Sequence, residues 1–187
     1  DKRPRRVPHV LRDLAAGRTP LREITSNPLL LIMLCDIFAT TGQVPPVLTT
    51  STLCARYCRE RVGEVRNPAK ALLLPAKHAL WCQLAHDMWQ SSGDYLVTSV
   101  PRSGLPEDTV SQRAREDLLS EGVLIERGPD RQRIGFIHQI VAEYSIAIYL
   151  RDHDESALNA LLTMLRRDPQ SRWYGWQIVR HLIALAA

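Results

Sequence analysis

Long apolar runs are missing from this chain of 187 residues. The longest candidate, PLLLIMLCDIFA, is interrupted by Asp36 and falls short of the roughly 18–20 apolar residues that a membrane-spanning helix needs. A secretory signal is also missing, because the first residues, DKRPRRVPHV, carry basic side chains with no apolar segment after them. The sequence therefore predicts a cytoplasmic protein without a membrane anchor. Because it does not begin with Met, we expect it to be a piece of a longer chain.

Cysteine pairs with the CxxC spacing are missing as well. The four cysteines are Cys35, Cys54, Cys58 and Cys82. Their spacing, together with the absent signal, favours reduced thiols. His78, Cys82 and His86 share one helical stripe, but three ligands spread over two helical turns cannot all reach one ion. A pair of them could do so together with a residue of a partner helix, but we expect no metal site.

Catalytic signatures are absent too. The chain contains no phosphate loop of the form GxxxxGK[ST], no GxGxxG dinucleotide motif and no GxSxG nucleophile motif. Adjacent carboxylates such as Glu116 and Asp117 fall on a charged helix face, which is typical of a solvated surface rather than of acid–base chemistry. We therefore expect no enzyme activity and no catalytic residues in this chain. The formal net charge of +4 is small and dispersed, so it does not indicate a nucleic-acid partner.

Helix signals dominate the first half of the chain. Residues 7–17 predict a short helix that stops at Gly17. Asn27 is the expected cap of the next helix, with Pro28 at its first position, and that helix ends near Gly42. A third helix, over residues 49–65, begins at a Ser/Thr cap and carries apolar residues at helical spacing.

The second half changes its pattern. The expected elements are a helix over residues 69–89, a short extended segment over 95–100, a helix over 106–122 and a hairpin of two strands over 123–137. A helix, a strand, a helix, a hairpin and a further helix in this order are typical of a winged-helix domain. Two amphipathic helices, over residues 155–168 and 173–187, complete the chain.

The fold class is therefore mainly α with a short β-hairpin. We expect a small helical domain over residues 1–67, a winged-helix domain over residues 68–152 and the start of a further helical region over residues 153–187. Winged-helix domains can bind DNA through their second helix, here residues 107–121. That helix is net acidic, whereas a helix that faces phosphates should be basic or neutral. A DNA-binding or transcription-regulatory module is the alternative function, and the helix charge argues against it.

The segment 135–150, GFIHQIVAEYSIAIYL, is nearly all apolar, yet three polar side chains stand near its start: His138, Gln139 and Glu143. A helix from about His138 would be largely buried, with Gln139 and Glu143 on one stripe. The positive helix end disfavours an imidazolium, so we expect a neutral histidine beside free backbone N–H groups, which suits a phosphate. A buried histidine that is hydrogen-bonded to a neighbour is the alternative, and the pattern alone favours it.

Two motifs resemble those of NACHT-type NTPases of the STAND class, which include the NOD-like receptors and bacterial antiphage relatives. The signature F-x-H-x-x-x-x-E-[YF]-x-x-A is matched by Phe136, His138, Glu143, Tyr144 and Ala147. The segment Asn-Pro-Leu-Leu-Leu at 27–31 resembles the N-P-L-x-L motif that follows the family's ATPase sheet. The helices and winged-helix pattern between the motifs also fit, so the resemblance covers nearly the whole chain.

The resemblance implies that Pro28 lies against the adenine of bound nucleotide and that His138 contacts the β-phosphate of ADP in a closed, inactive state. Glu143 and Tyr144 would brace the helix. ADP or ATP would be held mainly by an upstream ATPase domain, which would also supply the Mg²⁺ ligands and the phosphate loop. A downstream helical or repeat sensor domain and homo-oligomers after activation are further implied partners, in signalling or antiphage defence. This piece should neither hydrolyse ATP nor bind nucleotide tightly alone.

Overall fold

The computed structural model describes residues 24, 26–41, 48–63, 71–168 and 173–186, and it divides the chain into two compact units, residues 1–57 and 58–187. The helix expected over residues 7–17 and the domain boundary expected after Asn67 lie outside the described residues. In the described part of the chain, no helix has the length and apolar character needed to cross a membrane.

The first unit contains α3 (Pro28–Thr41) and most of α4 (Thr50–Cys58). The Asn27 side chain accepts hydrogen bonds from the backbone N–H groups of Leu29 and Leu30, at 3.0 and 3.4 Å. Asn27 therefore caps α3 and Pro28 is its first residue, as the sequence predicts. The unit buries apolar side chains of both helices: Leu30, Met33 and Ile37 of α3, and Leu53, Cys54 and Tyr57 of α4.

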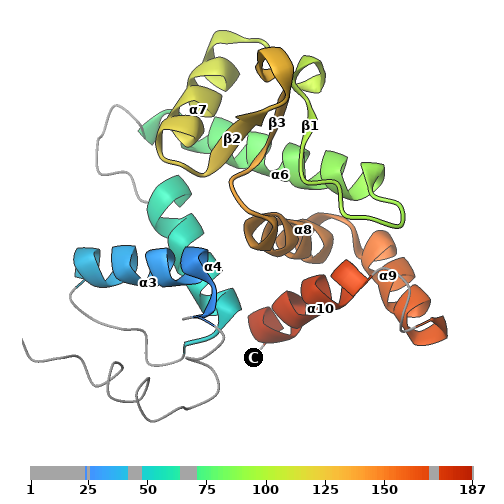
Figure 1. Cartoon of the computed structure of the whole chain (residues 1–187). Coiled ribbons are helices and arrows are strands. Elements are labelled where there is room, and N and C mark those ends of the chain that lie inside the picture. The colour runs from blue at the N-terminus through green and yellow to red at the C-terminus, as the bar shows by residue number, and fades with distance from the viewer. Residues whose placement is uncertain (1–23, 25, 42–47, 64–70, 169–172, 187) are drawn as a thin grey trace, which may run out of the picture. The chain divides into compact units, whose positions relative to one another are not determined.

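The second unit begins with a π-helical turn (Arg59–Gly63) and continues through a mixed block of helices and short strands. The elements of the block are α6 (Leu74–Ser91), β1 (Val100–Pro101), α7 (Thr109–Ser120), β2 (Leu124–Arg127), β3 (Arg133–Phe136) and α8 (Gln139–His153). The three strands form an antiparallel sheet in the order β1-β3-β2, with Leu124 opposite Phe136 and Arg127 opposite Arg133 (Figure 1). The protein is therefore mainly helical with one small sheet.

One predicted helix start lies outside the described residues and another is wrong. The start expected at Ala69 falls among residues that the structure does not describe, and α6 runs from Leu74 with Pro75 in its first turn, a position that proline tolerates. Leu72 precedes the helix and is 82% exposed. The helix expected from Pro106 begins at Thr109, because the Asp108 carboxylate accepts from two backbone N–H groups of the first turn and fixes the cap there.

The hairpin between β2 and β3 is confirmed, whereas the extended segment predicted over residues 95–100 pairs with the sheet only at its end, through Val100 and Pro101. The chain turns at Gly128, whose φ of 81° suits glycine, and then at Asp130 with a φ of 59°. Gly135 lies in β3, and a Cβ atom there would collide with the carbonyl oxygen of Thr98. A glycine at this position therefore lets the segment before β1 approach the central strand closely.

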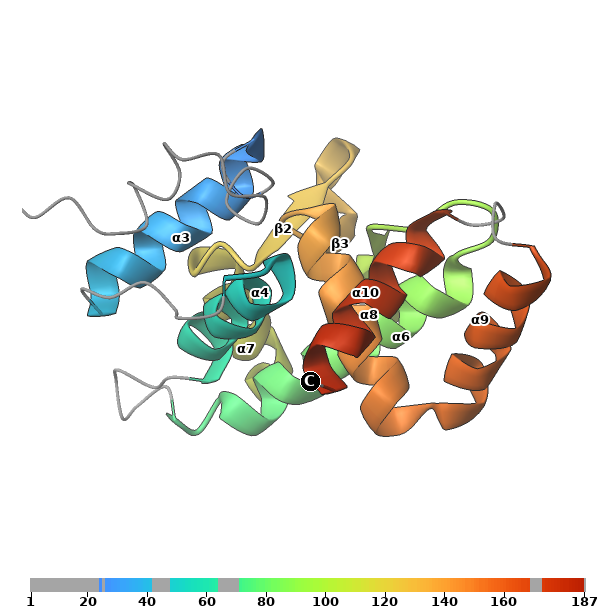
Figure 2. The same cartoon turned by 90° about the horizontal axis from the view of Figure 1, so that it is seen from below.

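The core of the second unit surrounds α8, which has α6 on one side and α10 (Trp173–Ala186) on the other (Figures 1 and 2). Against the sheet, the rings of Trp81 and Phe136 pack with their centroids 4.7 Å apart. The remaining helix, α9 (Glu155–Arg167), follows α8 and contacts α10, where Gly175 allows the close approach of Leu161 and Leu165. These contacts bury α8 on several sides.

Candidate functional site at the start of α8

His138 stands between the last strand and α8. Its backbone is extended, with φ −144° and ψ 151°, and its Nδ1 atom accepts a hydrogen bond from the backbone N–H of Ile140 at 3.2 Å. The prediction that this histidine lies at the N-terminus of the helix is therefore confirmed. The histidine itself caps the helix, a role that serine, threonine, aspartate or asparagine usually takes.

The hydrogen bond at Nδ1 determines where the proton of a neutral ring lies. Because Nδ1 accepts, a neutral imidazole carries its proton on Nε2, which then becomes a donor. Burial lowers the pKa of His138 from its usual value, and the positive charge of Arg127 lowers it further. The expected neutral histidine is thus supported, with burial as the larger cause. The site offers a hydrogen-bond donor that carries no charge.

Fewer backbone N–H groups are available here than the sequence suggests. The amide of Ile140 is used by the histidine ring, and the amides of Val141 and Ala142 donate to the carbonyl oxygen of His138, at 3.1 and 3.2 Å. In the described part of the chain, this leaves Gln139 as the first-turn residue whose amide has no partner. An anion at this place would therefore meet one side-chain donor and one backbone donor rather than an open helix end.

Gln139 and Glu143 form the polar stripe predicted for α8. The Gln139 amide nitrogen donates to the Glu143 carboxyl at 2.8 Å, and Glu143 is only 4% exposed. Burial raises the pKa of Glu143 to about 7, although the hydrogen bond from Gln139 opposes this rise. The pair holds its polar groups inside the unit, which fits a bracing role for Glu143 rather than contact with a ligand.

Arginines surround the hairpin beside His138, and three of them already have partners. Arg102 and Arg131 both pair with Glu126, at 3.1 and 3.6 Å. Arg133 donates to the hydroxyl and the carbonyl oxygen of Ser99. The exposed Arg127 has no carboxylate partner in the part of the chain that the structure describes. Its charge acts on His138, so the histidine lies in a positive environment, a feature that sequence spacing alone did not indicate.

Pro28, the other predicted nucleotide contact, is exposed at the first position of α3. It belongs to the first unit, and His138 belongs to the second. Its ring has no polar atom, so a flat apolar surface is what it offers to a ligand. The accessible position is compatible with contact to a planar base.

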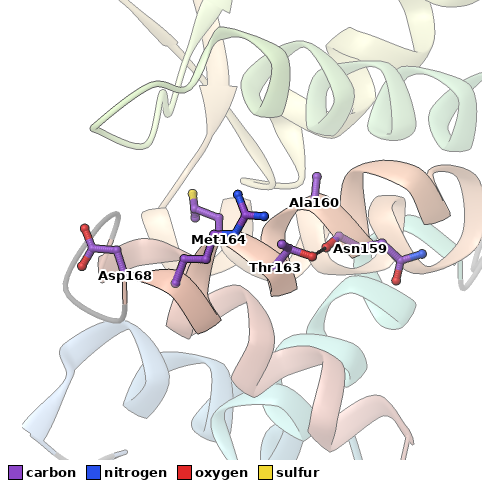
Figure 3. Close-up of a pocket in the computed structure, with 6 residues that line it drawn as sticks. Asn159, Ala160, Thr163, Met164 and Asp168 are labelled. Carbon is purple, nitrogen blue, oxygen red and sulfur yellow. Dashed lines mark hydrogen bonds between the residues drawn. The ribbon is translucent and has the colours of Figure 1, made fainter.

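An open groove elsewhere in the second unit is unrelated to these residues. It measures about 490 Å³ and runs along α9, where it is lined by Asn159, Ala160, Thr163, Met164, Arg167 and Asp168 (Figure 3). Within it, the Thr163 hydroxyl donates to the carbonyl oxygen of Asn159 at 2.8 Å. The groove contains neither Pro28 nor His138, and it brings together no set of groups suited to catalysis.

The histidine and cysteine stripe expected on one helix, His78, Cys82 and His86, lies on α6. Among the residues that the structure describes, no group of three or more histidine, cysteine, aspartate or glutamate side chains is placed to hold an ion. His78 is exposed, and the Nδ1 atom of His86 lies 3.1 Å from the carboxylate of Asp87.

Comparisons of this chain with protein-family models, with curated protein sequences and with solved structures gave no match.

Proposed function

We propose that this chain is the regulatory helical and winged-helix portion of a NACHT-type STAND NTPase. In this role it helps to hold ADP in an inactive state and rearranges for ATP-dependent oligomerisation in signalling or defence. The observation that carries the proposal is His138: the family's histidine motif falls at the junction of β3 and α8, and its ring has a donor to spare at Nε2.

The arrangement of elements supports a winged-helix domain. Helix α6, strand β1, helix α7, the β2–β3 hairpin and helix α8 follow one another in the order that the pattern requires. In the sheet order β1-β3-β2 the hairpin lies beside the short first strand, and in a winged-helix domain this hairpin would be the wing. In such a domain the histidine follows directly from the wing, so a movement of the whole domain would carry His138 with it.

The residues around His138 fit a phosphate group. The neutral ring would donate from Nε2 to a phosphate oxygen, and the nearby Arg127 would add a positive charge. An anion in this place would favour protonation of His138, because it would offset the effect of Arg127. The resemblance assigns the adenine contact to Pro28, which is exposed.

This chain would itself make few contacts to a nucleotide, so the proposal includes other domains that make the remaining contacts. We propose that an upstream ATPase domain of the same protein supplies the phosphate loop and the Mg²⁺ ligands for ADP or ATP. We further propose a downstream helical or repeat sensor domain, homo-oligomers in the active state and a cytoplasmic location. A ligand-driven switch of this kind requires contacts that differ between the two states, and His138 provides the contact of the ADP state.

The test is a His138→Leu substitution in the full-length parent protein. We expect the variant to release ADP faster and to shift from monomer toward its active assembly, because the donor at Nε2 is lost. The matched control is His78→Leu, which changes an exposed histidine of α6. ADP retention is measured on the purified protein and assembly by size-exclusion chromatography with light scattering. A His138→Leu protein that stayed monomeric and kept its ADP would contradict the proposal.

A winged-helix DNA-binding module is the second candidate, and the arginine-rich wing favours it. The side chains of α7, the second helix of the winged-helix pattern, argue against DNA binding. Arg115 of α7 is buried and Asp117 pairs with Lys77, so neither is available to DNA, while Glu116 is exposed. A gel-shift titration with duplex DNA at two salt concentrations separates the candidates. Strong, salt-dependent binding that is lost in Arg127→Ala and Arg131→Ala variants would favour DNA binding.

A further inference from the structure

Cys82 of α6 meets a residue of a partner helix. Its sulfur lies 3.6 Å from the Nε2 atom of His153, which is in the last turn of α8. Cys82 is half-buried and His153 is exposed, so solvent reaches the pair. The His153 ring also packs near Tyr149, with centroids 5.8 Å apart, and Tyr149 in turn meets the ring of His86 edge-on at 5.4 Å. Aromatic neighbours thus restrict the orientation of the imidazole.

The separation of the two atoms suits a shared divalent cation. Zinc binds cysteine sulfur at about 2.3 Å and histidine nitrogen at about 2.0–2.1 Å, so two ligands at a tetrahedral angle stand about 3.5–3.6 Å apart. The distance of 3.6 Å between Sγ and Nε2 therefore needs almost no rearrangement to accommodate the ion. A linear two-coordinate ion would need a wider separation, so the geometry favours tetrahedral coordination.

The local electrostatics also favour a cation. His153 lies at the carboxyl end of α8, where the helix dipole is negative. Two carboxylates, Asp152 and Asp154, flank it in the sequence. Arg151 partly opposes this charge, because its guanidinium binds both oxygens of Asp152, at 2.6 and 2.9 Å. The Asp154 side chain caps α9, where it accepts a hydrogen bond from the backbone N–H of Ala157 at 2.9 Å.

We propose that Cys82 and His153 form a two-residue chelate for Zn²⁺ that links α6 to the end of α8. No third protein ligand is placed to join them in the described part of the chain, so water completes the coordination shell. On binding, the Cys82 thiol gives its proton to solvent and the resulting thiolate forms the bond to the metal. The neutral imidazole donates the lone pair of Nε2. This site is independent of nucleotide binding and of the proposed function.

The test is a metal titration of the whole chain with Zn²⁺ and with Co²⁺, whose bond to a thiolate gives a charge-transfer absorption band. We expect one ion per chain and a Co²⁺ band that Zn²⁺ abolishes. Metal affinity should rise about tenfold per pH unit over the pH range in which the thiol of the metal-free chain is protonated. Zinc should also raise the unfolding temperature, since it joins two helices of the folded state.

Variants decide whether the pair is responsible. Cys82→Ser should abolish the Co²⁺ band, and His153→Ala should weaken binding on the order of tenfold or more. His78→Ala, on the same helix as Cys82, and Cys35→Ser, an exposed thiol of the first unit, are the controls and should bind like the parent. Circular dichroism checks that each variant is folded. The proposal is overturned by a parent chain that shows no Co²⁺ band, or by a His153→Ala variant that binds with unchanged affinity.

Discussion

His181 of α10 meets the ring of Tyr144 of α8 edge-on, with the centroids 5.5 Å apart and the ring planes at 82°. Tyr144 belongs to the histidine motif, and His181 is only 4% exposed. The contact joins α8, the helix that His138 caps, to α10. A charge on His181 would therefore act directly on the packing of α8 against α10.

Acid should loosen this contact. Burial lowers the pKa of His181 to about 4, with a smaller contribution from Arg180, whereas the unfolded chain protonates near 6.5. The unfolded state thus binds the proton first, and stability is lost as the pH falls from about 6.5 to about 4. The loss is on the order of 3 kcal/mol at most. Because Glu143 changes stability in the opposite direction over the same range, we compare the parent with His181→Gln, and we expect the urea midpoint of His181→Gln to rise relative to that of the parent as the pH falls from 7 to 4.5. A His78→Gln control should keep the pH dependence of the parent.

Glu143 should have the opposite pH dependence. Its pKa in the folded protein is about 7, raised by burial from 4.5, so the folded state holds the proton more tightly than the unfolded state. Its contribution to stability is fully present below pH 4.5 and is lost as the pH rises through 7. Glu143→Gln, which cannot ionise, should therefore be more stable than the parent at pH 8, by roughly 2–3 kcal/mol, and similar at pH 4.5. Urea unfolding of both proteins at the two pH values measures this. A Glu116→Gln control, which changes an exposed carboxylate of α7, should show no such gain. Equal stability of Glu143→Gln and the parent at pH 8 would contradict the expectation.

Lys77 and Asp117 form a buried ion pair between α6 and α7, with side chains that are 6% and 9% exposed. Lys77→Met should destabilise the unit by roughly 3–5 kcal/mol, because it removes the ammonium group from a buried carboxylate. The double variant Lys77→Met with Asp117→Leu should recover much of the loss, since no buried charge remains. Arg61→Met is the matched comparison: Arg61 pairs with Glu121 of the same region at 3.4 Å, but both side chains are about one-third exposed. That change should cost about 1 kcal/mol or less. Equal losses in Lys77→Met and Arg61→Met would show that burial does not control the effect.

The sequence predicts those parts of the fold that depend on residues close together in the chain. The Asn27–Pro28 cap, the turn at Gly128 and the helix from His138 each depend on residues that are close in sequence, so they were predictable. The start of α7 was not, because Pro106 and Asp108 both suit a helix start and only the hydrogen bonds of Asp108 separate them. The register of β1 with β3 depends on a close approach at Gly135, which joins segments far apart in the chain.

The sequence predicts some features of the candidate site and not others, for the same reason. The position of His138 follows from its neighbours in the sequence, and the pair Gln139–Glu143 follows from their helical spacing. The effect of Arg127 on His138 and the contact of Cys82 with His153 depend on tertiary packing, which spacing alone does not contain. His181 gave no signal in the sequence, because a histidine at a core position of an amphipathic helix resembles one on its surface.

Gly135 offers a steric test of the sheet. A Cβ atom at this position would meet the carbonyl oxygen of Thr98 and the Cα and Cβ atoms of Ser99, the last two at 3.1 Å. Gly135→Ala should therefore force β3 away from the segment before β1 and destabilise the second unit by roughly 1–3 kcal/mol. Gly93→Ala is the control, because no heavy atom lies within 4 Å of the Cβ position there and the change should be close to neutral. Urea unfolding gives the stabilities, and hydrogen exchange at Ile134 and Phe136 reports the sheet. Since backbone atoms cannot move aside as a side chain can, a Gly135→Ala protein as stable as Gly93→Ala would mean that Thr98 does not approach β3 as described.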